Sequence, residues 1–260
     1  MTGDGVHKHW TPAPTLQQGQ ASPAVTCKDG PMPKAGEADV GAPTKRPNNS
    51  CATSSSFSGY KDTPIFIEAC AGCGILSSVV QQRGFQVISI DCPRNRHVPK
   101  CRLVILDLTT PYAEQLLHRI VNDYHVAGVH IALPCGTCSK ARGIPLPDGK
   151  PGPPPLRDAD HLHGLDGLSD IDAAKVKAAN ELYAWADRFV RFLHAKGITW
   201  SIENPTNSWL WALPEMSFAL AHGHFVKLHA CAYGGERKKN TAFLCSSSQF
   251  LALEKFSKIL

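Results

Sequence analysis

The order of short apolar runs along the chain constrains its fold more than any other feature of the sequence. Each run has the length of a buried strand, and segments with helical spacing separate most of the runs. A polar or chemically reactive residue closes each run. The predicted strands are 64–68, 85–90, 102–106, 127–133 and 198–202, the predicted helices are 75–83, 111–124 and 173–196, and the closing residues are Glu68, Asp91, Asp107, Pro134 with Cys135, and Glu203.

Strands that alternate with helices predict a parallel sheet with right-handed crossover connections. Two further apolar segments, 225–231 and 241–245, flank a glycine-rich turn and predict an antiparallel pair. We therefore expect an α/β fold with a Rossmann-like, doubly wound, mostly parallel sheet and a C-terminal antiparallel hairpin. In such sheets ligands bind at the carboxyl ends of the strands, which is where the polar closing residues fall.

Composition indicates the domain organisation, the location and the possible partners of the protein. Residues 1–60 are rich in Pro, Gly, Ser and Thr without an apolar period, and we predict a disordered tail there, with 61–260 as one folded domain. The sequence has neither a membrane-spanning run nor a secretory signal, so we expect an intracellular protein, nuclear or cytoplasmic, that is not secreted or membrane-bound. Its ten cysteines are then mostly free thiols, and its net charge of +5 permits a nucleic-acid partner.

A glycine turn follows the first predicted strand. Gly72 and Gly74 allow the backbone to approach a ligand closely, but the turn lacks the Gly-Lys-Ser/Thr ending of a phosphate loop. Asp91 is placed to accept hydrogen bonds from both hydroxyls of a ribose, and Asp107 to face an adenine amino group. Taken singly, each acid also fits a strand-ending cap. Together, in order at successive strand ends, they favour an adenosine-containing ligand.

The end of the fourth predicted strand presents Cys135 behind a rigid Pro134, a position suited to a nucleophile. Carbon C5 of a pyrimidine is a poor nucleophile, but addition of a thiolate to C6 makes C5 enamine-like and able to attack a methyl group. The reaction also needs an acid near N3, which Glu203 could supply. Ionisation of the thiol requires positive charge nearby. Candidate sources are Lys140, Arg142 and Arg237.

The first half of the folded region resembles the class I S-adenosylmethionine-dependent methyltransferases. Phe66-Ile67-Glu68-Ala69-Cys70-Ala71-Gly72-Cys73-Gly74 resembles their first motif, Ile90-Asp91 the second and Asp107-Leu108 the third. The resemblance implies that S-adenosylmethionine is the cofactor, that Gly72 and Gly74 pass beneath its methionine part, and that Asp91 holds its ribose. The cofactor-binding residues expected on this basis are Phe66, Glu68, Gly72, Gly74, Asp91, Asp107 and Pro134.

The second half resembles the DNA cytosine-5 methyltransferases. Pro134-Cys135 with Ser139 matches their nucleophile motif, although Gly136 replaces the usual glutamine and Cys138 the usual aromatic residue. Glu203-Asn204-Pro205 resembles their Glu-Asn-Val motif, and Tyr233-Gly234 with Arg237 resembles their basic segment. The resemblance implies C5 methylation of cytosine in nucleic acid, DNA in preference to RNA. The expected catalytic residues are Cys135, Glu203 and Arg237.

The chain also departs from that family, which carries a large target-recognition region after the basic segment. Only 15 residues follow Cys245 here. Either recognition has moved into the loop 143–172, or the chain is a fragment, or it no longer selects a DNA sequence. The loop is dense in proline and glycine, and it fits a lid over the substrate as well as it fits a surface insertion.

Other functions remain open from the sequence. The pairs Cys70-x-x-Cys73 and Cys135-x-x-Cys138 could meet around a zinc ion or act as a redox dithiol. A catalytically inactive module that binds nucleic acid or cofactor on the same fold is a further alternative. Methylation of an exocyclic amine is disfavoured, because those enzymes place Asp or Asn, two prolines and an aromatic residue where this chain has Leu133-Pro134-Cys135-Gly136.

Overall fold

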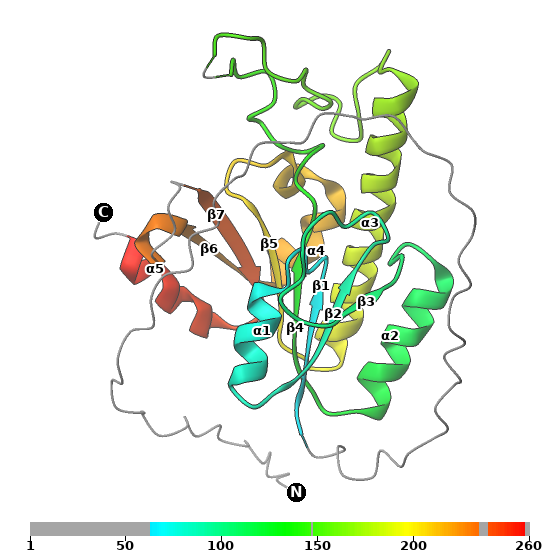
Figure 1. The fold of residues 1–260 in the computed structure, drawn as a ribbon, viewed down its shortest axis with the longest axis vertical. Coiled ribbons are helices and arrows are strands. Elements are labelled where there is room, and N and C mark those ends of the chain that lie inside the picture. Colours follow the sequence, from blue (N-terminus) through cyan, green and yellow to red (C-terminus); the bar gives the residue numbers. More distant parts are fainter. Residues whose placement is uncertain (1–62, 147, 234–238, 258–260) are drawn as a thin grey trace, which may run out of the picture. The chain divides into compact units, whose positions relative to one another are not determined.

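A computed structural model describes residues 63–146, 148–233 and 239–257 of the chain. This part is an α/β structure around one seven-stranded, mostly parallel sheet with the strand order β3-β2-β1-β4-β5-β7-β6 (Figure 1). The predictions made for residues 1–60 and for Arg237 lie outside the described residues. The strands are β1 (Ile65–Ala69), β2 (Gln86–Asp91), β3 (Leu103–Ile105), β4 (Val126–Ala132), β5 (Trp200–Pro205), β6 (His224–His229) and β7 (Asn240–Cys245).

The first five strands run parallel to one another, so their carboxyl ends share one edge of the sheet. From β1 the chain moves outward through β2 to β3, then returns to place β4 on the other side of β1. The strand order therefore reverses between β1 and β4, the kind of position at which open α/β sheets bind ligands. β7 pairs antiparallel with both β5 and β6.

The two longest helices begin at side chains that cap their first turns. In α2 (Pro111–Asp123) the Thr110 hydroxyl accepts a hydrogen bond from the backbone N–H of Ala113, and Pro111 occupies the first turn. Ser169 caps the longest helix, α3 (Asp170–Ala195), in the same way. The remaining helices are α1 (Ile75–Gln82), α4 (Ser217–His222) and α5 (Ala252–Ser257), with the 3₁₀ turns η2 (Trp209–Ala212), η3 (Pro214–Met216), η4 (Ala230–Tyr233) and η5 (Ser248–Leu251).

The core lies between α3 and the central strands. Tyr183, Trp185, Phe189 and Leu193 of α3 are fully buried, as is Trp200 of β5. Burial of large side chains such as these contributes roughly 1.5–3 kcal/mol each, so α3 is a main source of stability for this layer. None of the helices in the described residues is long and apolar enough to span a membrane.

Two strands differ from the sequence prediction. The run 102–106 was expected to be a buried strand, but β3 is a three-residue edge strand whose Val104 and Ile105 side chains are exposed. β5 was expected to end at Ile202, whereas it continues to Pro205, because its last residues pair with β7. Glu203 therefore lies inside a strand and is not the first residue after one.

The segment that joins β4 to α3 projects beyond the carboxyl edge of the sheet and returns to the start of α3 (Figure 1). Its middle is packed rather than free-standing, since Leu156 and Arg157 are each only 1% exposed. The expected loop 143–172 therefore includes an anchored part beside α3. This anchoring positions it next to the residues that follow β4.

Candidate functional site

The glycine turn after β1 has the backbone conformation that its sequence predicts. Gly72 and Gly74 have φ angles of +58° and +65°, a region that favours glycine. A Cβ atom added at Gly74 would lie 2.5 Å from the Cys101 sulfur, so a larger residue does not fit there. The turn is also held to β2, because the Ala71 N–H donates to the Ile90 carbonyl at 3.0 Å.

Asp91 at the end of β2 contacts this turn directly. One of its carboxylate oxygens accepts a hydrogen bond from the Gly72 N–H at 2.6 Å, and the other accepts from the Cys92 N–H at 2.7 Å. A carboxylate has about four acceptor sites, so each oxygen can accept a further donor. The structure thus brings Asp91 and Gly72 together, with acceptor capacity left for a ligand.

Glu68 lies in the same region, but its carboxylate faces α1. It is buried and accepts hydrogen bonds from both the hydroxyl and the backbone N–H of Ser77, the latter at 2.9 Å. Burial raises the pKa of the Glu68 carboxyl, and the two hydrogen bonds from Ser77 oppose that rise. Glu68 therefore fastens the first turn of α1 to the strand that carries the glycine turn.

Two other residues expected at the cofactor, Asp107 and Phe66, have local contacts of their own. Asp107 is exposed, and one of its oxygens accepts hydrogen bonds from the backbone N–H of Thr109 at 3.0 Å and from its hydroxyl at 2.7 Å. This is the capping role that an acid at a strand end often has. Phe66 lies near the start of β1 beside Gly128, in the body of the sheet and away from its carboxyl edge.

The residues after β4 form a short turn held on three sides. The Cys138 N–H donates to the Cys135 carbonyl at 3.0 Å, and the Cys138 carbonyl accepts from the Trp209 N–H at 2.9 Å. The Tyr183 hydroxyl, on α3, donates to the Pro134 carbonyl at 2.9 Å. Cys135 is half-buried within this turn and Cys138 is fully buried. The proposed nucleophile is therefore presented from a fixed backbone.

Glu203 faces the same end of the sheet from the neighbouring strand. It is in register with Ala132, three residues before Cys135. Lys239 forms an ion pair with it at 3.1 Å, and the Glu203 and Lys239 side chains are 17% and 56% exposed. The adjacent Asn204 is buried and donates a hydrogen bond to the Leu133 carbonyl at 2.7 Å, which joins β5 to the end of β4.

Positive charge surrounds the turn after β4. Arg142 donates to the Gly136 carbonyl at 3.2 Å, and Arg157 donates to the Thr137 hydroxyl at 3.1 Å. The Lys140 ammonium lies 3.6 Å from the centre of the Trp209 ring. The sequence offered Lys140 and Arg142 as candidate sources of positive charge without placing them. Arg157 and Tyr183 were not among the candidates, because no local pattern indicated that an arginine beyond a proline run would be buried here.

Arg157 is buried by a network of neutral partners. Its guanidinium donates to the Leu162 carbonyl at 2.6 Å and to the Asn180 side-chain oxygen at 2.7 Å, and it forms no ion pair within the described residues. Burial raises the pKa of the Cys138 thiol, while the nearby Tyr183 hydroxyl and the charge of Arg157 oppose that rise. The buried charge of Arg157 therefore acts on a thiol in the same turn that carries Cys135.

The four cysteines of the two C-x-x-C pairs are free thiols. Within residues 63–146, 148–233 and 239–257, no three His, Cys, Asp or Glu side chains are grouped so that they could hold a metal ion. The zinc site considered from the sequence is therefore not formed by Cys70, Cys73, Cys135 and Cys138.

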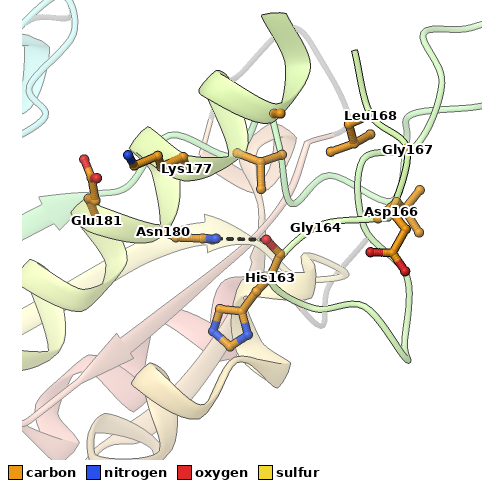
Figure 2. Close-up of a pocket in the computed structure, with 11 residues that line it drawn as sticks. His163, Gly164, Asp166, Gly167, Leu168, Lys177, Asn180 and Glu181 are labelled. Carbon is orange, nitrogen blue, oxygen red and sulfur yellow. Dashed lines mark hydrogen bonds between the residues drawn. The ribbon is translucent and has the colours of Figure 1, made fainter. Parts of the chain in front are cut away.

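A separate pocket of about 450 Å³ lies between residues 163–168 and the first half of α3 (Figure 2). Asn180, one of the residues that line it, donates a side-chain hydrogen bond to the His163 carbonyl at 2.9 Å (Figure 2). Neither Asp91 nor Cys135 lines it. The pocket belongs to the anchored segment beside α3 and is distinct from the site at the strand ends.

Comparison with known proteins leaves the site to be interpreted from its own geometry. No protein-family model matches the sequence, and no curated protein matches it.

Proposed function

We propose that this protein is an S-adenosylmethionine-dependent methyltransferase that methylates C5 of cytosine in nucleic acid, DNA in preference to RNA. We further propose that its sheet is a doubly wound, Rossmann-like sheet with β6 and β7 as a terminal hairpin. The observation that carries the proposal is the distribution of groups along one sheet edge. Asp91, hydrogen-bonded to the glycine turn, lies on one side of the strand reversal. On the other side are the half-buried Cys135 after β4 and Glu203 in the neighbouring strand β5.

The glycine turn fits an adenosine cofactor on two grounds. The positive φ angles of Gly72 and Gly74 set the shape of the turn beneath the proposed cofactor, and Asp91 keeps acceptor sites free for ribose hydroxyls. Asp107, whose second oxygen accepts no hydrogen bond within the described residues, would contact the adenine amino group. Phe66 and Glu68 would support the cofactor site indirectly. Phe66 would do so as part of β1, and Glu68 by fastening α1. When bound, S-adenosylmethionine supplies an electrophilic methyl group.

The second half of the edge fits the chemistry of the base. The Cys135 thiolate would add to C6 of cytosine while N3 takes up a proton, so that the electron pair of the C5–C6 double bond becomes available at C5. Carbon C5 would then take the methyl group, and the electron pair of the broken sulfur–methyl bond would remain on the cofactor sulfur. A base would remove the C5 proton as the Cys135–C6 bond breaks and the C5–C6 double bond re-forms, and N3 would return its proton to Glu203. Pro134 would line the boundary between base and cofactor.

Glu203 would supply the proton to N3 and hold the exocyclic amine. In the free protein its partner is Lys239, a largely exposed side chain that an incoming base can displace without disturbing the strand. Arg142 brings positive charge to the turn that carries Cys135, because its guanidinium donates to the Gly136 carbonyl. A similar role for Arg237 is proposed from the sequence alone.

The test is transfer of a labelled methyl group to a cytosine-containing duplex DNA. Cys135→Ser should abolish transfer while S-adenosylmethionine still binds, and Glu203→Gln should reduce transfer by roughly two to four orders of magnitude, the range expected for a positioned general acid. Cys231→Ser, which alters another half-buried thiol, is the matched control and should remain active. With 5-fluorocytosine in the DNA, wild-type protein should form a covalent adduct and Cys135→Ser should not.

The other outcomes point to different functions. Full activity in Cys135→Ser would remove the nucleophile assignment. Binding of cofactor or DNA without any turnover would favour the inactive binding module. Loss of cofactor affinity in Glu203→Gln, in step with the rate, would show that Glu203 does not face the base.

A further inference from the structure

The connection between β2 and β3 concentrates positive charge. Residues 92–102, here called the basic loop, contain Arg94, Arg96, Lys100 and Arg102, all exposed, and no acidic residue. The net charge of the whole chain is only +5. A short segment with four cations in such a chain produces a local positive potential that attracts polyanions.

These four cations have no carboxylate partners among the described residues. Several other surface cations do have such a partner, as Arg188 has Glu114 at 2.9 Å and Lys239 has Glu203 at 3.1 Å. Lys150, Lys175 and Arg191 are paired in the same way. The charges of the basic loop are therefore available to an external anion.

The loop is also held in shape before any partner binds. The Asn95 side chain donates to the Gly72 carbonyl at 2.7 Å, and the Lys100 N–H donates to the Cys73 carbonyl at 2.7 Å. The Cys101 sulfur lies 3.2 Å from the Ser89 hydroxyl. Because the backbone is already ordered against the glycine turn, binding would require little further loss of conformational entropy.

An exposed apolar side chain stands among these cations. Val98 is 81% exposed, between Arg96 and Lys100. Nucleic-acid surfaces combine phosphates with apolar sugar and base faces, and proteins that contact them place apolar side chains beside basic ones. The basic loop has both kinds of group in one short stretch.

The position of the loop relates it to the proposed nucleophile. It leaves β2 at Asp91, on the same sheet edge as Cys135 after β4, and β1 is the single strand between them. Neighbouring strands are about 4.8 Å apart, which places the ends of β2 and β4 about 10 Å apart. A nucleic acid with one base at Cys135 would carry its flanking phosphates over this distance.

We infer that the basic loop is a contact surface for the sugar-phosphate backbone of nucleic acid. The inference rests on the proposed function for the identity of the bound substrate. It adds a surface that determines the path of the nucleic-acid strand. On this path the nucleic acid crosses the glycine turn, next to the cofactor half of the sheet edge. Recognition of the backbone by this loop is independent of base sequence.

The test compares two double variants that remove equal charge. Arg94→Gln/Arg96→Gln alters the loop. Arg83→Gln/Arg119→Gln alters exposed arginines outside it, Arg83 lying just before β2 begins and therefore near the opposite edge. Binding of a labelled duplex oligonucleotide is measured as a function of salt concentration, and S-adenosylmethionine binding is measured for each protein.

The loop variant should weaken DNA binding by about tenfold and flatten the dependence of log affinity on log salt by about two, as expected for two lost phosphate contacts. The control should change affinity by roughly twofold or less. Equal binding by wild type and loop variant, or no DNA binding by wild type, would overturn the inference. So would loop-dependent binding to anionic phospholipid vesicles without loop-dependent binding to DNA.

The same measurements separate this inference from the proposed function. If the folded protein binds no S-adenosylmethionine but shows loop-dependent DNA binding, the methyltransferase proposal fails and the contact surface stands. If the protein binds S-adenosylmethionine and the loop variant binds DNA as tightly as wild type, the inference about the basic loop fails and the methyltransferase proposal stands.

Discussion

At the scale of single residues, Gly74 is the position where the cofactor half is least tolerant of change. It has a φ of +65° immediately before α1, and a Cβ atom there would lie 2.5 Å from the Cys101 sulfur. We predict that Gly74→Ala lowers the free energy of unfolding by about 2–4 kcal/mol, from backbone strain and overpacking together. Chemical denaturation measures the loss.

Gly84 separates these two causes. It also has a positive φ, of +89°, but a Cβ atom there meets nothing within 4 Å. Gly84→Ala should therefore cost only about 1 kcal/mol. The double variant Gly74→Ala/Cys101→Ala should be compared with Cys101→Ala alone. In that comparison most of the extra loss of unfolding free energy at Gly74 should disappear. Equal costs at the two glycines would show that Cys101 does not confine the turn.

Some of the site residues could be predicted from the sequence because their positions follow from strand ends. Gly72 lies in the turn after β1, and Asp91 ends the neighbouring parallel strand β2, so their contact is a consequence of the strand order. The roles of Glu68 and Arg157 could not be predicted in this way. The partner of Glu68 depends on the angle at which α1 leaves the turn, and burial of Arg157 depends on how an irregular segment folds back on α3.

At the scale of elements, the contact between β4 and β5 contains a buried histidine. His130 lies beside the Ser201 hydroxyl, with its Nδ1 at 2.8 Å from the oxygen. Burial lowers the pKa of His130 from 6.5 to about 4. Between these pH values the folded protein binds fewer protons than the unfolded chain, so stability rises with pH and is lost as pH falls from 6.5 toward 4.

This linkage predicts an acid-induced loss of about 3 kcal/mol that is due to His130. In His130→Gln, which keeps a hydrogen-bonding group for Ser201, that part of the pH dependence should disappear. His224→Gln, at an exposed position, should leave the profile unchanged. Free energies of unfolding from pH 4 to pH 7 give the comparison, and identical profiles for wild type and His130→Gln would contradict a buried neutral histidine.

The segment before α3 depends on Arg157 in a different way. Removing its guanidinium leaves the Leu162 carbonyl, the Asn180 side-chain oxygen and the Thr137 hydroxyl without their donor. We predict that Arg157→Met destabilises the protein by about 2–4 kcal/mol. Hydrogen exchange of amides such as that of Leu165, which donates to the Leu156 carbonyl, should accelerate.

Arg188→Met is the matched control for this change. Arg188 is half exposed and paired with Glu114, and such surface pairs contribute about 1 kcal/mol or less. A loss at Arg157 no larger than the loss at Arg188 would mean that the buried network does not anchor the segment.

Element boundaries show where local pattern stops being informative. β1 and β4 were predictable because continuous apolar runs are typical of strands buried on both faces. The apolar run at β3 has the same appearance, yet β3 lies at the sheet edge, and the run itself carries no signal of how many neighbours it has. The end of β5 is set by pairing with β7, some 40 residues later in the chain, a contact outside any local window.

At the scale of the whole molecule, the chain presents three kinds of chemistry along one sheet edge. The glycine turn follows β1 and the basic loop follows β2. The cysteine turn follows β4, and Glu203 lies in β5. The α/β class and the mostly parallel sheet predicted from the sequence are confirmed. The methyltransferase function remains a prediction, and it depends first on whether the glycine turn binds its cofactor.

Calorimetric titration of the folded protein with S-adenosylmethionine tests that dependence most directly. We predict one binding site per chain, with affinity reduced about tenfold or more in Asp91→Ala, because the hydrogen bonds of a carboxylate to ribose hydroxyls contribute roughly 1.5–3 kcal/mol. Thermal unfolding of the variant confirms that it is folded, since Asp91 also holds Gly72. Binding that is unchanged in Asp91→Ala, or no binding by intact wild-type protein, would contradict the account.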